Sequence, residues 1–209
     1  MTNDYNPAIT EYARSLFDAI GVSQLSNGDS LLILGLESTP DRNLDEFGHL
    51  DDKFQMYGFA KHIDPRLESL LDFIRGKGFS AEPIGRYGYP LEGEIDLKSE
   101  VIHAGLCKRG KSTLALHSKY GPRLRFIAIR IDTPLEPITD STLAGEENPV
   151  CDGCSICIEV CPTKALEPCH MVDPLLCLSN VTQMTEDGRS ILCDKCLHLC
   201  PAAKEKQMT

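Results

Sequence analysis

Nine of the ten cysteines in this chain lie between Cys151 and Cys200. The first cysteine run, CDGCSICIEVCP, has the spacing Cys-x2-Cys-x2-Cys-x3-Cys-Pro. This is the bacterial ferredoxin run, in which three neighbouring thiolates hold one [4Fe–4S] cluster and the fourth cysteine ligates a second cluster. The cysteine-rich segment, residues 151–209, is short and buries too little apolar surface to be stable by packing alone. We therefore expect it to be built around its metals.

A second run, CDKCLHLCP, repeats the Cys-x3-Cys-Pro ending but has Ser190 where a third leading cysteine would stand. The missing ligand must come from elsewhere, and Cys177 is available upstream, with Cys169 as the alternative. If Cys177 is the ligand, we interpret Cys169 as a buried thiol near the clusters. We therefore expect two ligand sets: Cys151, Cys154, Cys157 and Cys200 for one cluster, and Cys161, Cys177, Cys193 and Cys196 for the other.

Two tetrahedral zinc sites are the alternative, because Cys-x2-Cys pairs also bind zinc. Zinc sites need neither the third closely spaced cysteine nor the crossing Cys-Pro turn, so the pattern favours clusters. A disulfide framework would need an oxidising compartment and an export signal, and the N-terminal residues MTNDYNPAITEYARSLF do not resemble one. We expect a cytoplasmic protein with no membrane span, whose oxygen-sensitive clusters suit anaerobic chemistry.

The formal net charge is −10, which argues against nucleic acid as a partner because a polyanion would be repelled on average. The stretch from Val101 to Ile131 is different, with seven lysines or arginines and no acidic residue. Its positive field indicates either a site for an anionic group or a solvated face. The candidate residues for such a site are Lys108, Arg109, Lys111, Lys119, Arg123 and Arg125.

Apolar periodicity predicts helices over 7–20, 64–76 and 95–106, and strands over 30–36, 79–84 and 123–131. Helices alternating with strands indicate an α/β layered domain. We place this α/β domain at 1–135, a Pro- and Thr-containing linker at 136–150, and a small ferredoxin-like α+β domain at 151–209.

The stretch HAGLCKRGKSTL has the letters of a nucleotide-binding P-loop, with Gly105, four residues, and then Gly110, Lys111 and Ser112. A working P-loop lies between a buried strand and a helix. Here the preceding apolar residues repeat at helical spacing, so we interpret the match as fortuitous.

Three segments in the order AGLCKRGKSTLALHSKYGPRLRFIAIRIDTPLEP, CDGCSICIEVCPTKAL and VDPLLCLSN resemble the family that unites epoxyqueuosine reductases and reductive dehalogenases. The resemblance covers roughly residues 65–201. It implies a nitroreductase-like α/β domain that holds base-off cobalamin, followed by two [4Fe–4S] clusters that pass single electrons to cobalt. The cofactor-binding residues that it implies are Gly105, Cys107, Gly110, Lys111 and Ser112.

The chain departs from this family at two places. Cys107 stands where the family has a second glycine, and Leu91 falls near the position of the catalytic aspartate. Tyr89 and Glu92, in the loop GRYGYPLEGE, are then the candidate proton donors beside the cofactor. No histidine has the Asp-x-His-x-x-Gly setting that replaces the lower base of cobalamin, so any corrinoid would be bound base-off.

Two functions from different classes remain open at this point. One is a cobalamin-dependent reductase that receives electrons from the two clusters, and the other is a non-enzymatic electron carrier that serves a partner protein. Both imply an electron donor or acceptor protein as partner. The oligomeric state, including a homodimer, stays open.

Overall fold

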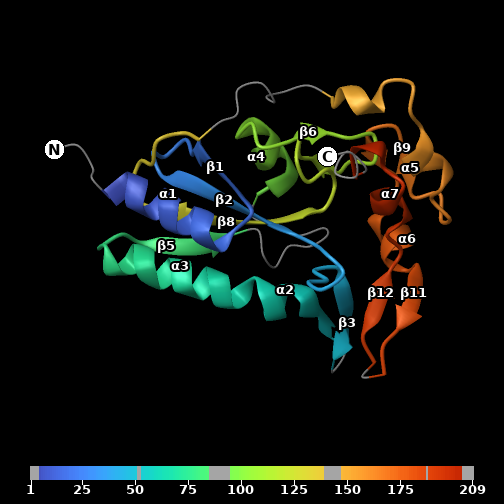
Figure 1. The fold of residues 1–209 in the computed structure, drawn as a ribbon, viewed down its shortest axis with the longest axis horizontal. Coiled ribbons are helices and arrows are strands. Elements are labelled where there is room, and N and C mark those ends of the chain that lie inside the picture. Colours follow the sequence, from blue (N-terminus) through green and yellow to red (C-terminus); the bar gives the residue numbers. More distant parts are fainter. Residues whose placement is uncertain (1–4, 51–52, 85–94, 139–146, 187, 204–209) are drawn as a thin grey trace. The chain divides into compact units, whose positions relative to one another are not determined.

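The computed structural model describes residues 5–50, 53–84, 95–138, 147–186 and 188–203 (Figure 1). The chain forms two compact units. Unit 1 comprises Met1–Leu36, Asp64–Cys107 and Arg125–Gly145, and unit 2 comprises Glu37–Ile63, Lys108–Leu124 and Glu146–Thr209. The division therefore differs from the contiguous domains expected from the sequence, because residues 37–63 and 108–124 group with the cysteine-rich residues. Composition along the chain could not reveal such an exchange of segments.

Unit 1 is built on a four-stranded sheet with the order β1-β2-β8-β5, in which β1 is antiparallel to β2 and β5 is antiparallel to β8. Its strands are β1 (Ala19–Gln24), β2 (Ser30–Glu37), β5 (Ala81–Ile84) and β8 (Leu124–Ile131). The continuous apolar run of β2 is buried over seven of its eight residues, as expected for a central strand.

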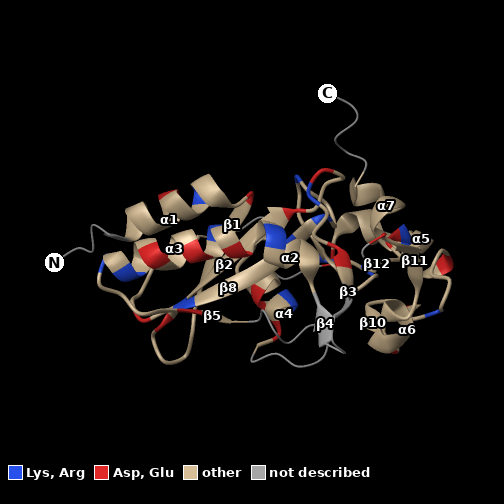
Figure 2. Cartoon of the chain, turned by 90° about the horizontal axis from the view of Figure 1, so that it is seen from below, with Lys and Arg blue, Asp and Glu red and all other residues tan. Residues whose placement is uncertain are grey.

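Three helices cover this sheet: α1 (Tyr5–Leu16), α3 (Asp64–Gly76) and α4 (Leu97–His103). Helices α1 and α3 contact each other, while α4 contacts β1. Figure 2 shows α4 on the opposite side of the sheet from α1 and α3, and it shows charged residues along α1 and α3. On β1, a Cβ at Gly21 would lie 2.7 Å from the Leu106 side chain, so the glycine permits the close approach of the segment after α4.

Helix α1 is shorter than expected, because it ends at Leu16 and residues 19–24 form β1. Ile20 and Val22 are both buried in the strand. The side chain of Ile20 continues the helical periodicity of α1, so the predicted helix ran to residue 20 and the strand was not predicted. The other expected helices and strands are present, with ends displaced by a few residues.

Unit 2 contains a four-stranded sheet with the order β11-β12-β3-β4 and two small hairpins, β6-β7 and β9-β10. The sheet strands are β3 (Glu46–Leu50), β4 (Lys53–Gln55), β11 (Val181–Met184) and β12 (Ser190–Leu192). The hairpin strands are β6 (Lys108–Arg109), β7 (Ala115–Leu116), β9 (Leu166–Glu167) and β10 (His170–Met171). The Arg189 guanidinium lies 3.2 Å from the Glu46 carboxylate and joins the β11-β12 hairpin to β3.

Short helices of unit 2 carry four of its nine cysteines, namely Cys151, Cys157, Cys177 and Cys196. These helices are α2 (Tyr57–His62), α5 (Ile156–Glu159), α6 (Pro174–Leu178), α7 (Lys195–His198) and the 3-10 turns η1 (Pro149–Cys151) and η2 (Pro201–Ala203). The apolar core around them is small: Cys161, Ala165 and Leu166 are buried, and Cys177 and Cys196 pack against them. The expectation that metal ligation supplies part of the stability of the cysteine-rich segment stays a prediction.

Candidate metal centre

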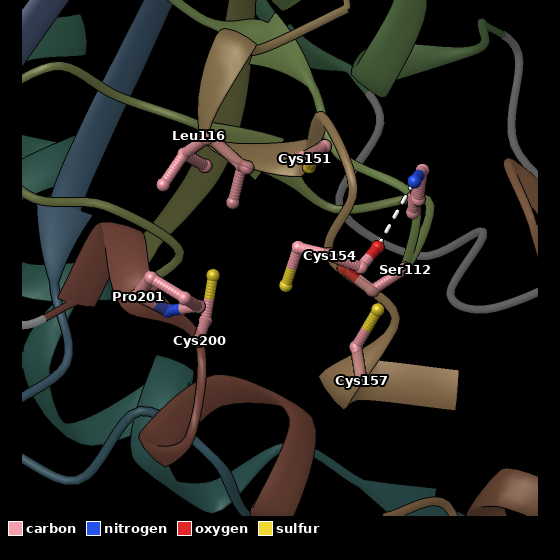
Figure 3. Close-up of a pocket in the computed structure, with 9 residues that line it drawn as sticks. Ser112, Leu116, Cys151, Cys154, Cys157, Cys200 and Pro201 are labelled. Atoms are coloured by element: carbon pink, nitrogen blue, oxygen red, sulfur yellow. Dashed lines mark hydrogen bonds between the residues drawn. The ribbon is translucent and has the colours of Figure 1, made fainter. Parts of the chain in front are cut away.

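The first cysteine group surrounds a cavity in unit 2 (Figure 3). The sulfur atoms of Cys154, Cys157 and Cys200 point into a common space, and Cys151 lies at its edge. The cavity occupies about 310 Å³, including space open to solvent. It is lined by Lys111, Ser112, Leu116, Val150, Cys151, Cys154, Cys157, Cys200 and Pro201. All four cysteines expected to hold the first cluster therefore face one site.

The electrostatics of these thiols agree with their grouping. The pKa of Cys157 is raised by burial and by the nearby Cys151, Cys200 and Cys154 thiolates. Burial also raises the pKa of Cys200, although hydrogen bonds from the backbone N–H groups of Ala202 and Ala203 oppose the shift. Like charges disfavour thiolates and cations favour them. A positively charged ligand would therefore offset the repulsion among the sulfurs of this group.

The second cysteine group forms around Cys196. Burial raises its pKa to about 12, and the next causes are the charges of Cys177 and Cys193, followed by those of Cys157 and Cys161. Cys161, Cys177 and Cys196 also pack in the small apolar cluster around Ala165 and Leu166. Thus the structure brings together the four cysteines that the sequence grouped for the second cluster.

Cys161 differs from the other cysteines because its pKa is lowered. Burial acts to raise it, but hydrogen bonds from Thr163 and from the backbone of Ala165 and Leu166 outweigh that cause. Donors aimed at a sulfur favour the thiolate, which is the form that binds metal. The Cys-Pro turn therefore prepares Cys161 as a ligand.

The two groups are neighbours within unit 2. Cys157 of the first group contributes to the raised pKa of Cys196 in the second, and the helices that carry them, α5 and α7, are in contact. This proximity is what electron exchange between two bound centres requires.

The donor set fits an iron–sulfur cluster. Four cysteines line the first cavity, and their soft sulfurs are the usual ligands of such clusters. Among the residues that the structure describes, no group of three Cys, His, Asp or Glu side chains has the arrangement of a single-ion site. Clusters rather than zinc ions at these cysteines stay a prediction.

The Tyr-Gly-Pro-Arg turn at residues 120–123 holds the segment that follows Cys200. Arg123 donates from one terminal nitrogen to the backbone oxygen of Ala203 over 2.9 Å, and from Nε to the Glu37 carboxylate over 2.9 Å. Gly121 has a φ of +56°, and a Cβ there would clash with the Ala202 carbonyl oxygen. The turn therefore sets the backbone whose N–H groups face Cys200.

The Gly-Lys-Ser segment is the loop of the β6-β7 hairpin. Gly110 donates to the Leu114 carbonyl over 2.8 Å, and Thr113 adopts a φ of +66° in the turn. The segment does not connect a strand to a helix, in agreement with the interpretation that the P-loop letters are fortuitous. Its Lys111 and Ser112 line the cysteine cavity, and Lys111 Nζ donates to the Cys154 carbonyl over 2.9 Å (Figure 3).

The two remaining cysteines lie in different surroundings. The Cys169 thiol donates to the Glu147 carboxylate over 2.8 Å, and that hydrogen bond is the main cause of its raised pKa. Among charges that act on Cys169 is that of Cys151, so this thiol lies beside the first group. Cys107, in unit 1, is fully buried, and burial raises its pKa far above the usual value.

Other residues singled out from the sequence have varied outcomes. Tyr89 and Glu92 lie outside the described residues. Gly105 has a φ of +70° in the turn after α4. His198 is an exposed residue whose ring nitrogen lies 2.7 Å from a carboxylate oxygen of Asp194, the N-cap residue of α7.

Two carboxylates with structural roles were not anticipated. Glu37 is the partner of Arg123, and Glu147 accepts from Cys169. Neither belongs to a recognisable motif, because the partner of each carboxylate is distant in the sequence.

Comparison with known proteins supports a redox family. No protein-family model matches the chain. Epoxyqueuosine reductase from Listeria monocytogenes is 30% identical over 119 residues, which are 52% of this chain and 30% of the relative. The enzyme from Burkholderia pseudomallei is 31% identical over 166 residues, or 71% of this chain and 39% of the relative. The enzyme from Cyclobacterium marinum is 28% identical over 193 residues, which are 82% of this chain and 57% of the relative. The chain thus spans less than two thirds of these curated relatives.

Solved structures share the fold. A selenomethionine-labelled epoxyqueuosine reductase has a TM-score of 0.66 at 19% identity, covering 96% of this chain and 66% of that one. Another, crystallised with an epoxyqueuosine-modified tRNA-Tyr stem loop, has a TM-score of 0.65 at 18% identity, covering 96% and 65%. The catabolic reductive dehalogenase NpRdhA, in complex with 3-bromo-4-hydroxybenzoic acid, has a TM-score of 0.62 at 14% identity, covering 95% and 32%.

These findings bear on two expectations. One structural neighbour was solved with a tRNA stem loop, and the expectation that nucleic acid is not a partner of this chain stays a prediction. No helix among the described residues is long and apolar enough to cross a membrane. In sequence the chain belongs with the epoxyqueuosine reductases, and it shares its mixed α/β fold with solved structures of epoxyqueuosine reductases and reductive dehalogenases.

Proposed function

We propose that this chain is an iron–sulfur redox protein that passes single electrons through two [4Fe–4S] clusters to a reductase centre. The observation that carries the proposal is the separation of eight cysteines into two neighbouring groups of four, the first of which faces a cavity. The reductases among its relatives favour this function over that of a free-standing electron carrier.

In this proposal Cys151, Cys154, Cys157 and Cys200 hold one cluster, and Cys161, Cys177, Cys193 and Cys196 hold the other. When bound, the clusters supply one-electron transfer at low potential. The chain supplies what surrounds them: Leu116 and Pro201 are apolar walls of the first site, which lower the local dielectric. The backbone N–H groups after Cys161 and Cys200 donate to the sulfurs and stabilise their negative charge.

A corrinoid is the electron acceptor that the relatives suggest, since one structural neighbour at 14% identity and a TM-score of 0.55 is described as catalysing B12-dependent dehalogenation. Of the residues expected to contact it, Lys111 and Ser112 line the cysteine cavity, which does not fit that role. The placement of these two residues thus gives no structural support to a corrinoid at this cavity. Its binding, and proton donation by Tyr89 or Glu92, remain proposals from family resemblance.

The test is anaerobic purification or reconstitution of the full chain, followed by iron, acid-labile sulfide, zinc and cobalt analysis. About eight irons and about eight sulfides per chain support the two-cluster proposal. A colourless protein with about two zinc ions and no sulfide contradicts it. Titration with hydroxocobalamin then separates the two acceptor hypotheses, because a base-off spectrum supports a corrinoid reductase and the absence of binding favours a protein acceptor.

A further inference from the structure

The β6-β7 hairpin loop places one lysine at the first cysteine group. Lys111 Nζ donates to the Cys154 carbonyl over 2.9 Å, and Lys111 lines the cavity that the four sulfurs share (Figure 3). The two residues are 43 positions apart in the sequence, so the contact is a tertiary one. A cationic side chain at the wall of a metal cavity alters the electrostatic potential inside it.

The loop holds this lysine in a defined position. Gly110 donates to Leu114 over 2.8 Å, and the Thr113 N–H donates back to Gly110 over 2.9 Å. The Lys111 carbonyl also accepts a 2.9 Å hydrogen bond from the backbone of Cys169. A Cβ on Gly110 would lie 2.8 Å from the Leu116 side chain, so the loop packs tightly on its own hairpin. Lys111 is thus fixed at both ends, by its backbone and by its ammonium group.

Three other charged groups near the two sites are more exposed than Lys111, whereas the half-buried Arg123 is paired with Glu37. Glu147, the carboxylate that accepts from Cys169, is exposed, and solvent therefore screens its charge more than that of the half-buried Lys111. Lys164 and Lys195, which flank cysteines of the second group in the sequence, are exposed as well. The positive field of Lys111 therefore acts mainly on the first group.

We infer that Lys111 sets the order of reduction of the two centres, making the first the more easily reduced, so that electrons move from the second group to the first. The inference rests on the proposed two-cluster function. Each added electron makes a cluster more negative, and a nearby fixed positive charge stabilises that state and raises the reduction potential. Lys111 acts on the energy of the added electron through its charge, and its hydrogen bond to the Cys154 carbonyl fixes where that charge lies.

The experiment compares midpoint potentials of the full reconstituted chain by EPR-monitored redox titration at one pH. Lys111→Gln keeps a hydrogen-bond donor and removes the charge, Lys111→Arg keeps the charge, and Lys61→Gln removes an exposed lysine of α2 as the control. The first-group signal is assigned as the one that survives in Cys196→Ser. In Lys111→Gln we expect its reduction equilibrium to weaken roughly tenfold, a fall of about 59 mV for one electron. The midpoint potential of the second signal should stay near its parent value in Lys111→Gln. In Lys111→Arg and Lys61→Gln both midpoint potentials should stay near the parent values.

Each other outcome has a definite meaning. Two intact clusters with unchanged potentials in Lys111→Gln overturn the inference while leaving the two-cluster function in place. Loss of the first cluster from both Lys111 variants also overturns it, since the lysine would then be a structural support only. A parent chain without iron and sulfide contradicts the proposed function itself.

Discussion

Arg123 donates a 2.9 Å hydrogen bond to the backbone oxygen of Ala203, three residues beyond Cys200 and 80 positions away in the sequence. The same guanidinium pairs with Glu37, and both side chains of this pair are less than one quarter exposed. The segments that contain Glu37 and Arg123 are thereby joined to the turn that follows Cys200, a cysteine of the first group.

Replacing this arginine should loosen the first site selectively. In Arg123→Met the hydrogen bond to Ala203 and the pair with Glu37 are lost, at a cost of roughly 1–3 kcal/mol in the free energy of unfolding. We expect about half of the iron to be released faster by a chelator, measured as two kinetic phases of absorbance loss. Arg130→Met, which removes an exposed pair with Glu82, is the control and should release iron like the parent. Equal acceleration of both phases would contradict a role confined to Cys200.

Gly121→Ala should be more damaging than an alanine at another glycine with positive φ. At Gly121, with a φ of +56°, the new Cβ meets the Ala202 carbonyl oxygen, whereas at Gly28, with a φ of +90°, it meets open space. Both variants carry backbone strain of about 1 kcal/mol, but only the first adds a clash. Thermal unfolding and iron retention are the measurements. If Gly28→Ala lowers both as strongly, the close approach to Ala202 has no energetic importance.

Cys161→Ser should affect the second centre although Cys161 belongs to the first cysteine run. Its neighbours in the apolar core are Cys177 and Cys196, so the lost ligand is one of theirs. We expect EPR spectra to lose or alter the same signal in Cys161→Ser and Cys177→Ser, and the other signal in Cys157→Ser.

The matched control for this assignment is Cys169→Ser. This thiol donates to Glu147 and lies near Cys151, and its removal should leave both signals and about eight irons in place. A Cys177→Ser protein with unchanged spectra, together with a Cys169→Ser protein that lacks a cluster, would reverse the choice between these two cysteines.

The buried thiol of Cys107 predicts a pH dependence of stability. Its pKa in the folded chain is raised from the ordinary value of 9.0 by burial. The folded state then retains a proton that the unfolded state releases, so the stabilising contribution is complete below pH 9 and declines as pH rises above that value. The slope is at most about 1.4 kcal/mol per pH unit.

Urea unfolding at pH 8 and pH 10 measures this contribution. The parent should lose more stability between the two pH values than Cys107→Ala, and the difference between them isolates this thiol from the other cysteines. Identical losses in both proteins would show that Cys107 does not remain protonated. The thiol should also resist alkylation in the folded chain at pH 8, because the thiolate is the reactive form.

The spacing of residues along the sequence was enough to predict the cysteine runs and most helices and strands. A Cys-x2-Cys pair or a Leu67, Leu70, Leu71, Ile74 stripe brings its side chains together within one or two turns of backbone, so the letters alone indicate the geometry. At Ile20, whose apolar side chain suits both periodicities, the same reasoning extended the first helix to residue 20, into the start of β1.

Contacts between distant segments could be decided only by the tertiary structure. The Gly-Lys-Ser loop has the letters of a phosphate site, yet pairing of β6 with β7 turns Lys111 toward Cys154 instead. Likewise, the role of Arg123 depends on where Glu37 and Ala203 come to lie. Sequence spacing constrains only neighbours along the chain, whereas burial and backbone pairing determine which remote groups meet, and those meetings set the charge and the donors around each cysteine.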